Sequence, residues 1–209
     1  MPEDDLFSPS APDLPDVGPN TTIAALRKEA AHCTRCHLYK DATQTVFGEG
    51  PPDARIMMVG EVPGDQEDTQ GKPFVGPAGQ LLDRALEKAG IDRREVYVTN
   101  AVKHFKFERR GKRRMHKTPD RPEIEACKWW LDREMEVVRP ELVVALGGTA
   151  GTALYGRAVR VLSERGRISA DPRGFRVMLT VHPSMILRVP DADKDRAFAD
   201  FVRDLRKAA

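Results

Sequence analysis

Four short runs of apolar and often β-branched residues recur along the chain, and each predicts a buried strand. They span residues 55–60, 96–102, 142–146 and 177–181. The segments between these runs place apolar residues at helical spacing. Strands that alternate with helices predict crossover connections and a mainly parallel sheet with helices on both faces. The pattern therefore predicts an α/β fold with three α/β/α layers and a central, mainly parallel four-stranded sheet.

The predicted helices share apolar residues three and four positions apart, with proline or glycine near their ends. They span about 22–31, 79–90, the segment from Pro119 or Pro122 to before Pro140, and 149–155. The longest of them has a predicted inward face made of Ile124, Cys127, Leu131, Met135 and Val138.

The first twenty residues differ in composition from the rest of the chain. Residues 1–20 hold five prolines, five acidic residues and no Lys or Arg. Such a segment buries too little apolar surface to offset the entropy lost on ordering. We predict a disordered acidic tail over 1–20 and a single domain over 21–209, a length that supports one hydrophobic core.

Basic residues are concentrated in one segment. Residues 103–117 contain eight Lys or Arg and one acidic residue, a charge of +7, so the remainder carries −5 of the net +2. A basic segment on an otherwise acidic protein is typical of a site for a polyanion, although a solvated loop has the same composition. No apolar run approaches membrane-spanning length and no export signal is recognisable, so we expect a cytoplasmic protein that associates with the nucleoid when on DNA.

The three cysteines argue against a disulfide framework, because their number is odd and the chain lacks an export signal. Cys33 and Cys36 are spaced so that one metal centre can bind both, and Cys127 lies on the predicted inward helix face. His104 is available as a fourth donor. Residue types alone leave a zinc site, a [4Fe–4S] cluster and a set of unligated thiols all open.

Polar or glycine residues follow each predicted strand. In parallel α/β sheets, ligands bind beyond the carboxyl ends of the strands, so these residues are the first candidates for a site. In chain order the candidate segments are 60–64 (GEVPG), Asn100, Gly147-Gly148 and 182–184 (HPS).

The segment 60–83, GEVPGDQEDTQGKPFVGPAGQLLD, resembles the first motif of the iron–sulfur uracil-DNA glycosylases, the family-4 group and its relatives. Asn100 in TNAVK, the run LVVALGG and the HPS triplet follow in the same order as in that family. The resemblance extends from Cys33 to about Leu187 and implies the uracil-DNA glycosylase fold. It also implies a structural [4Fe–4S] cluster bound by Cys33, Cys36, His104 and Cys127.

Two features resemble the X-type branch (UdgX), whose members end the reaction covalently attached to DNA. His104 stands where family-4 sequences have a cysteine, and the basic insertion 112–116 (KRRMH) precedes Lys117. One position departs from that branch. X-type sequences have Gln after the motif glutamate, whereas this chain has Val62, which removes a polar contact and predicts less efficient trapping.

The resemblance implies a pocket for a flipped uracil. Phe74 would lie flat against the base, unless it is simply a core residue. Asn100 would bind the O4 and N3–H edge of uracil, where cytosine presents the opposite pattern of donor and acceptor. His182 would donate a hydrogen bond to O2 of the departing base, assisted by the backbone of the loop that follows the first strand. The implied loop positions are Gly60, Val62, Gly64 and Asp65.

In the X-type interpretation, neutral His116 bonds to C1′ of the deoxyribose, with Glu61 orienting or deprotonating its imidazole. The implied DNA contacts are Lys112, Arg113, Arg114 and Ser184. We expect a monomer whose partner is uracil-containing DNA, with single strands accepted. The alternatives are an ordinary glycosylase that uses water as its nucleophile, and a metal-stabilised nucleic-acid-binding module without activity. Glu61, Asn100 and His182 at three strand ends argue against the second.

Overall fold

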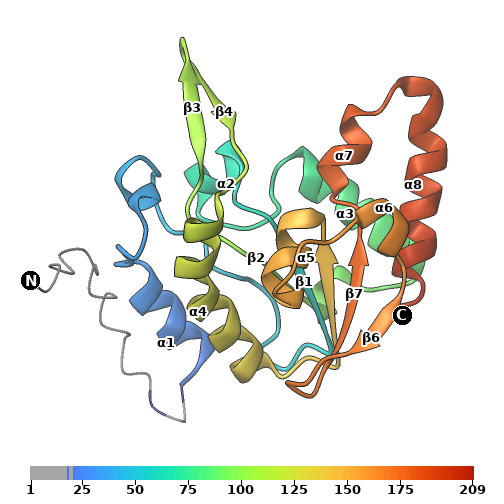
Figure 1. Ribbon diagram of the computed structural model, residues 1–209, viewed down its shortest axis with the longest axis horizontal. Coiled ribbons are helices and arrows are strands. Elements are labelled where there is room, and N and C mark those ends of the chain that lie inside the picture. The colour runs from blue at the N-terminus through green and yellow to red at the C-terminus, as the bar shows by residue number, and fades with distance from the viewer. Residues whose placement is uncertain (1–17, 19–20) are drawn as a thin grey trace, which may run out of the picture.

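The computed structural model describes residue 18 and residues 21–209 (Figure 1). The predicted acidic tail over 1–20 lies outside the described residues, except for Gly18. Within the described range, no helix is long and apolar enough to cross a membrane.

The central sheet has five strands among the described residues, in the order β2-β1-β5-β7-β6. They are β1 (Ile56–Gly60), β2 (Val96–Asn100), β5 (Leu142–Leu146), β6 (Ile168–Ala170) and β7 (Arg176–Thr180). All neighbours pair in parallel except β6, which is antiparallel to β7. The predicted fold class is confirmed, but the predicted number of strands was one too low. β6 has only three residues and all are exposed, so it lacks the apolar run that marks a buried strand.

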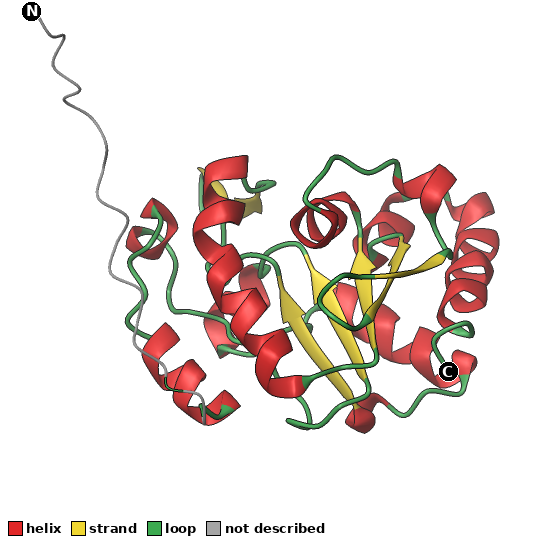
Figure 2. Ribbon diagram, turned by 60° about the horizontal axis from the view of Figure 1, so that its bottom comes forward, coloured by secondary structure: helices red, strands yellow, loops and turns green. Residues whose placement is uncertain are grey.

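Helices cover both faces of this sheet (Figures 1 and 2). One layer contains α1 (Ile23–Ala30), α4 (Arg121–Val138) and α5 (Gly148–Tyr155), and the other contains α3 (Pro77–Ala89), α7 (Pro183–Arg188) and α8 (Asp191–Leu205). Side chains alternate between the two layers along each strand. In β1, for example, Met57 and Val59 belong to the first core and Met58 to the second.

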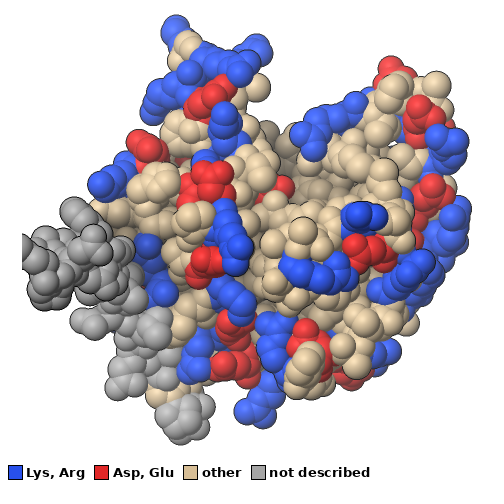
Figure 3. Space-filling model, in the orientation of Figure 1, with Lys and Arg blue, Asp and Glu red and all other residues tan. Residues whose placement is uncertain are grey.

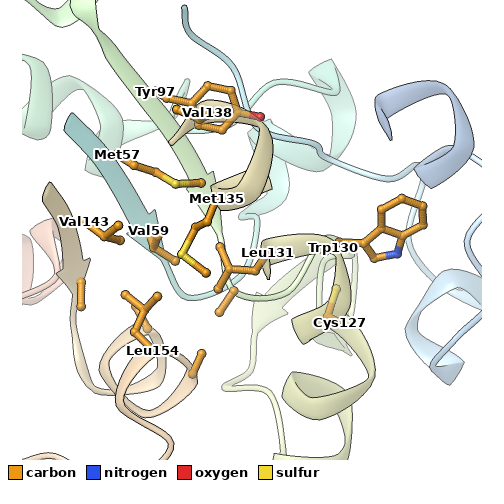
Figure 4. Close-up of a cluster of buried hydrophobic side chains, with 14 of the residues drawn as sticks. Met57, Val59, Tyr97, Cys127, Trp130, Leu131, Met135, Val138, Val143 and Leu154 are labelled. Carbon is orange, nitrogen blue, oxygen red and sulfur yellow. The ribbon is translucent and has the colours of Figure 1, made fainter. Parts of the chain in front are cut away.

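The long helix α4 forms where the prolines and the apolar pattern predicted it. Asp120 and Glu123 make a reciprocal capping box at its start, and Arg139 ends it in the left-handed conformation, one residue before Pro140. Figure 4 shows Cys127, Leu131, Met135 and Val138 on its buried face, together with Trp130, which the predicted face omitted. Ile124 is partly buried and packs against the same core, so it also lies on the inward face.

The basic segment folds into an antiparallel hairpin of β3 (Phe107–Arg110) and β4 (Arg113–His116), which sequence reasoning treated only as a charged loop. Phe107 pairs with His116 in this register, and Gly111 at the turn has a positive φ of 60°. The hairpin projects beyond the carboxyl ends of the parallel strands, on the same side as α7 (Figure 1). We call residues 107–116 the basic hairpin.

Short elements complete the connections. They are α2 (Asp65–Gln70), α6 (Val161–Glu164) and the 3₁₀ turns η1 (His37–Lys40) and η2 (Arg93–Glu95). The helix α2 matters for the site, because it begins directly after the GEVPG loop and lies beneath the basic hairpin (Figure 1).

Candidate functional site

The ends of β1 and β2 bring two predicted site residues together. Gly60 and Asn100 are register partners at the last position of the two strands. A Cβ atom at Gly60 would lie 2.3 Å from Asn100 Oδ1 and 2.7 Å from the Phe74 ring. Only glycine therefore allows the Asn100 and Phe74 side chains to close over this strand end.

Phe74 is held in an unusual backbone conformation. Its φ is +56°, although it is not a glycine, and its side chain is buried. A Cβ at Gly79 would lie 1.7 Å from the Phe74 carbonyl oxygen, so the first turn of α3 packs directly against the Phe74 backbone. Such strained positions persist only where the surroundings enforce them, and they are frequent at functional sites. Phe74 is buried and also faces the site, so its interpretation as a core residue is compatible with its interpretation as a ring that lies against the base.

His182 lies opposite Phe74, with the two rings nearly parallel at 27° and their centroids 6.1 Å apart. Its Nδ1 accepts a hydrogen bond from the Ser184 backbone N–H at 3.1 Å and lies 2.9 Å from the Ser184 hydroxyl. Because Nδ1 acts as an acceptor, a neutral ring carries its proton on Nε2. Burial, together with His116 and Arg188, lowers the pKa of His182 to about 4. His182 is therefore a neutral donor at physiological pH. We call Gly60, Phe74, Asn100 and His182 the strand-end pocket.

His116 and Glu61 approach this pocket from different elements. Glu61 follows β1, and its Oε1 is buried without a hydrogen-bond partner among the described residues. His116 ends β4 and is solvent-exposed overall, yet partial burial lowers its pKa, with Glu61 and Glu67 opposing and Arg188 reinforcing that shift. The two side chains thus interact electrostatically, and the imidazole is neutral at physiological pH.

Arg114 holds the basic hairpin onto α2. Its Nε lies 2.5 Å from Asp65 Oδ1 and its Nη1 lies 2.6 Å from Asp68 Oδ2, a fully buried carboxylate. The guanidinium also lies over the rings of Phe105 and Phe107, at 5.3 and 5.2 Å from their centroids. These two carboxylates already occupy the guanidinium that the sequence interpretation assigned to phosphate contacts. Arg114 is better suited to fixing His116, two residues along the same strand.

Two of the other predicted DNA contacts lie on open surface, whereas Ser184 is half-buried beside His182. Lys112 and Arg113 are exposed at the turn of the basic hairpin, and Lys and Arg atoms cover this projection in Figure 3. The same view shows a hollow between the hairpin and the part of the molecule that carries α7. On the α7 side, Arg188 donates to the Ser184 carbonyl oxygen at 3.1 Å. Arg188 also helps to lower the pKa of His116 and of His182, an influence on the site that the sequence did not predict.

Three thiols converge beneath the site. Burial raises the pKa of Cys127 to about 12, and nearby Cys33 and Cys36 contribute to the shift. The pKa of Cys36 is also raised, mainly by burial and further by Cys33. Two N–H groups point at these sulfurs: Trp130 Nε1 lies 3.2 Å from Cys33 Sγ, and the Lys103 backbone N lies 3.2 Å from Cys127 Sγ.

His104 is buried at the end of the segment that contacts Cys127. Its Nε2 lies 2.8 Å from Thr45 Oγ1, and burial lowers its pKa, so the ring is neutral. Three clustered thiols with N–H donors aimed at sulfur, and a neutral imidazole on the residue after Lys103, are a donor set that fits an iron–sulfur cluster. Over the described residues, no group of three or more His, Cys, Asp or Glu side chains is placed to hold a single metal ion.

Comparison with known proteins gives concordant matches. The family model described as the uracil DNA glycosylase superfamily matches residues 47–206. A type-4 uracil-DNA glycosylase of Thermotoga maritima is 40% identical over 157 residues, covering 75% of this chain and 78% of that protein. A type-4 enzyme of Pyrobaculum aerophilum is 38% identical over 179 residues, with 80% and 86% coverage. A type-5 enzyme of the same organism is 32% identical over 152 residues, with 65% and 63% coverage.

Proposed function

The chain belongs to the uracil-DNA glycosylase superfamily and is a uracil-DNA glycosylase, and we propose that it remains covalently attached through His116 to the deoxyribose from which it has removed uracil. The observation that supports this proposal is the position of His116. It is a neutral imidazole on a hairpin that Arg114 fixes to α2, and it interacts electrostatically with Glu61, whose buried Oε1 has no hydrogen-bond partner among the described residues.

Recognition of uracil is assigned to the strand-end pocket. The base must leave the stack to reach it. Phe74 offers a ring face, and the Asn100 amide offers a donor for O4 and an acceptor for N3–H. The backbone at Gly60, Val62, Gly64 and Asp65 completes the edge of the pocket. Cytosine presents the opposite donor and acceptor pattern, so one fixed amide is enough to discriminate against it.

Cleavage breaks the bond between C1′ and N1, and the electron pair leaves with the uracil. Negative charge therefore develops on the base and positive charge on the sugar. Neutral His182 would donate its Nε2 proton in a hydrogen bond to O2 of the departing base. The Ser184 N–H bond to Nδ1 supports this role, because it fixes both the ring orientation and the tautomer.

Capture then forms a bond between an imidazole nitrogen of His116 and C1′. The imidazole gains positive charge, and Glu61 is the group that stabilises it or accepts its proton. The lowered pKa of His116 favours this step, because only the neutral imidazole has a free electron pair with which to attack C1′. In the alternative, an ordinary turnover enzyme, water takes the place of His116. Val62, a buried apolar residue where X-type sequences have Gln, is the feature that favours this alternative.

We assign the [4Fe–4S] cluster to Cys33, Cys36, Cys127 and His104. His104 would be the fourth ligand, with its Nε2 already in contact with Thr45 Oγ1. When bound, the cluster would supply a structural tie rather than redox chemistry, because cleavage of a glycosidic bond requires no electron transfer. It would join the CxxC loop to α4 and to the segment after β2.

We further propose that DNA enters along the hollow between the basic hairpin and α7, with Lys112, Arg113 and Ser184 contacting the backbone (Figure 3). An open hollow of this kind suits single strands. We propose that the protein is a monomer located in the cytoplasm and that it associates with the nucleoid when it is bound to DNA.

The deciding experiment is a denaturing gel of the protein incubated with a labelled single strand that contains one uracil. We expect one protein to remain on one strand after SDS and heating. Repeated uracil release without a heat-stable adduct would favour the ordinary turnover enzyme. The absence of both uracil release and adduct would contradict the trapped enzyme and the turnover enzyme alike.

A further inference from the structure

Lys103 and Glu134 form an ion pair that is completely enclosed by the protein. The Nζ–Oε2 distance is 2.5 Å, and both side chains have 0% exposed surface. Removing two charges from water costs free energy that their attraction often fails to recover, and apolar residues of similar volume can replace such pairs without loss of stability. Stability alone therefore does not explain the pair, and its other contacts show what it does.

The ammonium group of Lys103 has three protons and three acceptors. Besides Glu134, Nζ donates to Thr99 Oγ1 and to the backbone carbonyl oxygen of Asn100, each at 2.7 Å. Its hydrogen-bonding capacity is therefore filled. Two of the three acceptors belong to the last two residues of β2.

Glu134 accepts hydrogen bonds from side chains of the same strand. Its carboxylate accepts hydrogen bonds from Tyr97 OH at 2.9 Å and Thr99 Oγ1 at 3.0 Å, both on β2. It also accepts from the Gly48 backbone N–H at 3.1 Å, and a Cβ at Gly48 would lie 2.3 Å from Oε1. A carboxylate from α4 thus connects three points on or next to β2.

The backbone after Asn100 links this network to the site. Ala101 N–H donates to the Gly60 carbonyl oxygen at 2.9 Å, and Val102 N–H donates to that of Glu61 at 3.0 Å. The Lys103 N–H points at Cys127 Sγ. The short segment 100–103 therefore runs from the pocket to the thiols, and the Lys103 side chain turns back to hold its first residue.

We propose that the Lys103–Glu134 pair is a positioning element that fixes the backbone of Asn100, and thereby the orientation of its side-chain amide toward uracil. The inference rests on the proposed uracil-releasing function. Discrimination by an amide requires its donor and acceptor to stay in one orientation, and a small rotation of its backbone moves both. A fully hydrogen-bonded ion pair restricts that rotation more strongly than apolar packing, because each Nζ bond has a defined direction.

The test compares Glu134→Gln with Lys103→Met/Glu134→Gln. Both variants keep an amide at position 134 that can bond to Tyr97, Thr99 and Gly48. They differ in the Nζ group that bonds to the Asn100 carbonyl. We expect the double variant to release uracil about tenfold more slowly than Glu134→Gln in single-turnover assays at saturating DNA, and to be inhibited by free uracil about tenfold more weakly. Affinity for a strand without uracil should stay the same, because the variants do not alter the basic hairpin.

The matched control is Arg173→Met/Asp171→Asn, which removes a partly exposed ion pair with an Nε–Oδ1 distance of 2.8 Å, just before the amino end of β7. It also removes the contact of Arg173 with Asp132 on α4, but none with β2. Its uracil inhibition should equal that of wild type. Equal uracil inhibition and equal single-turnover rates in Glu134→Gln and the double variant would overturn the inference while leaving the glycosylase assignment intact. Failure of wild type to release or bind uracil would instead contradict the proposed function.

A measurement on the wild-type protein covers the case in which the double variant does not fold. Proton and ¹⁵N NMR should show a slowly exchanging Lys103 ammonium with contacts to Thr99 and Asn100, since three acceptors and complete burial shield its protons from water. A rapidly exchanging Lys103 ammonium would overturn the inference without any substitution.

Discussion

The strand-end pocket and the basic hairpin contribute to the same site but are held in different ways. The pocket is built from ends of parallel strands, and Asn100 and Phe74 have 3% and 8% of their surface exposed. The hairpin projects beyond the sheet and carries an exposed histidine. Its attachment to α2 depends largely on the contacts of Arg114. The difference predicts that bond cleavage and the proposed covalent capture are separable, because the two steps would use groups on differently held elements.

The largest expected effect comes from His116→Ala. The stable protein–DNA adduct should disappear while uracil release continues, because the strand-end pocket is untouched and water can reach C1′. A denaturing gel and a uracil-release assay on the same samples measure both steps. Met115→Ala is the control, since Met115 is exposed on the adjacent position and should retain the adduct. An adduct in His116→Ala would mean that another nucleophile is used.

His182→Ala should impair both steps together. Loss of one hydrogen-bond donor to the developing negative charge is expected to slow uracil release about 100-fold, and capture cannot precede cleavage. Single-turnover rates of uracil release and of adduct formation provide the measurement. If the adduct forms at the wild-type rate in this variant, His182 is structural and the leaving base is stabilised elsewhere.

Arg114→Met should affect mainly the hairpin. It removes the contacts with Asp65 and Asp68, so His116 loses its fixed position, and adduct yield per uracil released should fall about tenfold. Arg113→Met is the matched control, because it removes the same charge from the same hairpin at an exposed position. Equal adduct yields in the two variants would show that Arg114 acts only through its charge.

The smallest effect should appear as pH falls from about 7 to about 5, a range in which an ordinary histidine becomes protonated. Burial lowers the pKa of both rings, which favours their neutral forms. His182, with a pKa of about 4, stays neutral throughout, so uracil release should persist. His116 is more exposed and protonates first, and its cation cannot attack C1′. The adduct yield per uracil released should therefore decline on acidification. If uracil release and adduct formation instead declined in parallel, the proposed separation of cleavage from capture would be contradicted.

The sequence predicted the pocket better than the hairpin. Gly60, Asn100 and His182 follow predicted strands, and in a parallel sheet the ends of such strands meet at one edge, so their proximity followed from the fold class. Residues 107–116 have no apolar alternation that could predict paired strands. Their structure depends on Phe105 and Phe107 lying under the Arg114 guanidinium, which the charge pattern alone does not reveal.

What the sequence determined by itself is what repeats locally: the four buried strands, the helices α1, α3, α4 and α5, and the order of the motifs. Such features depend on neighbours within a few residues, and the spacing of apolar side chains encodes them directly. The helices α7 and α8 were not predicted. The tertiary structure decided the edge strand β6, the attachment of the hairpin and the bonds of Lys103 to Glu134 and Asn100. These contacts join residues on separate elements, and only the packing of those elements brings a buried charge within reach of its partner.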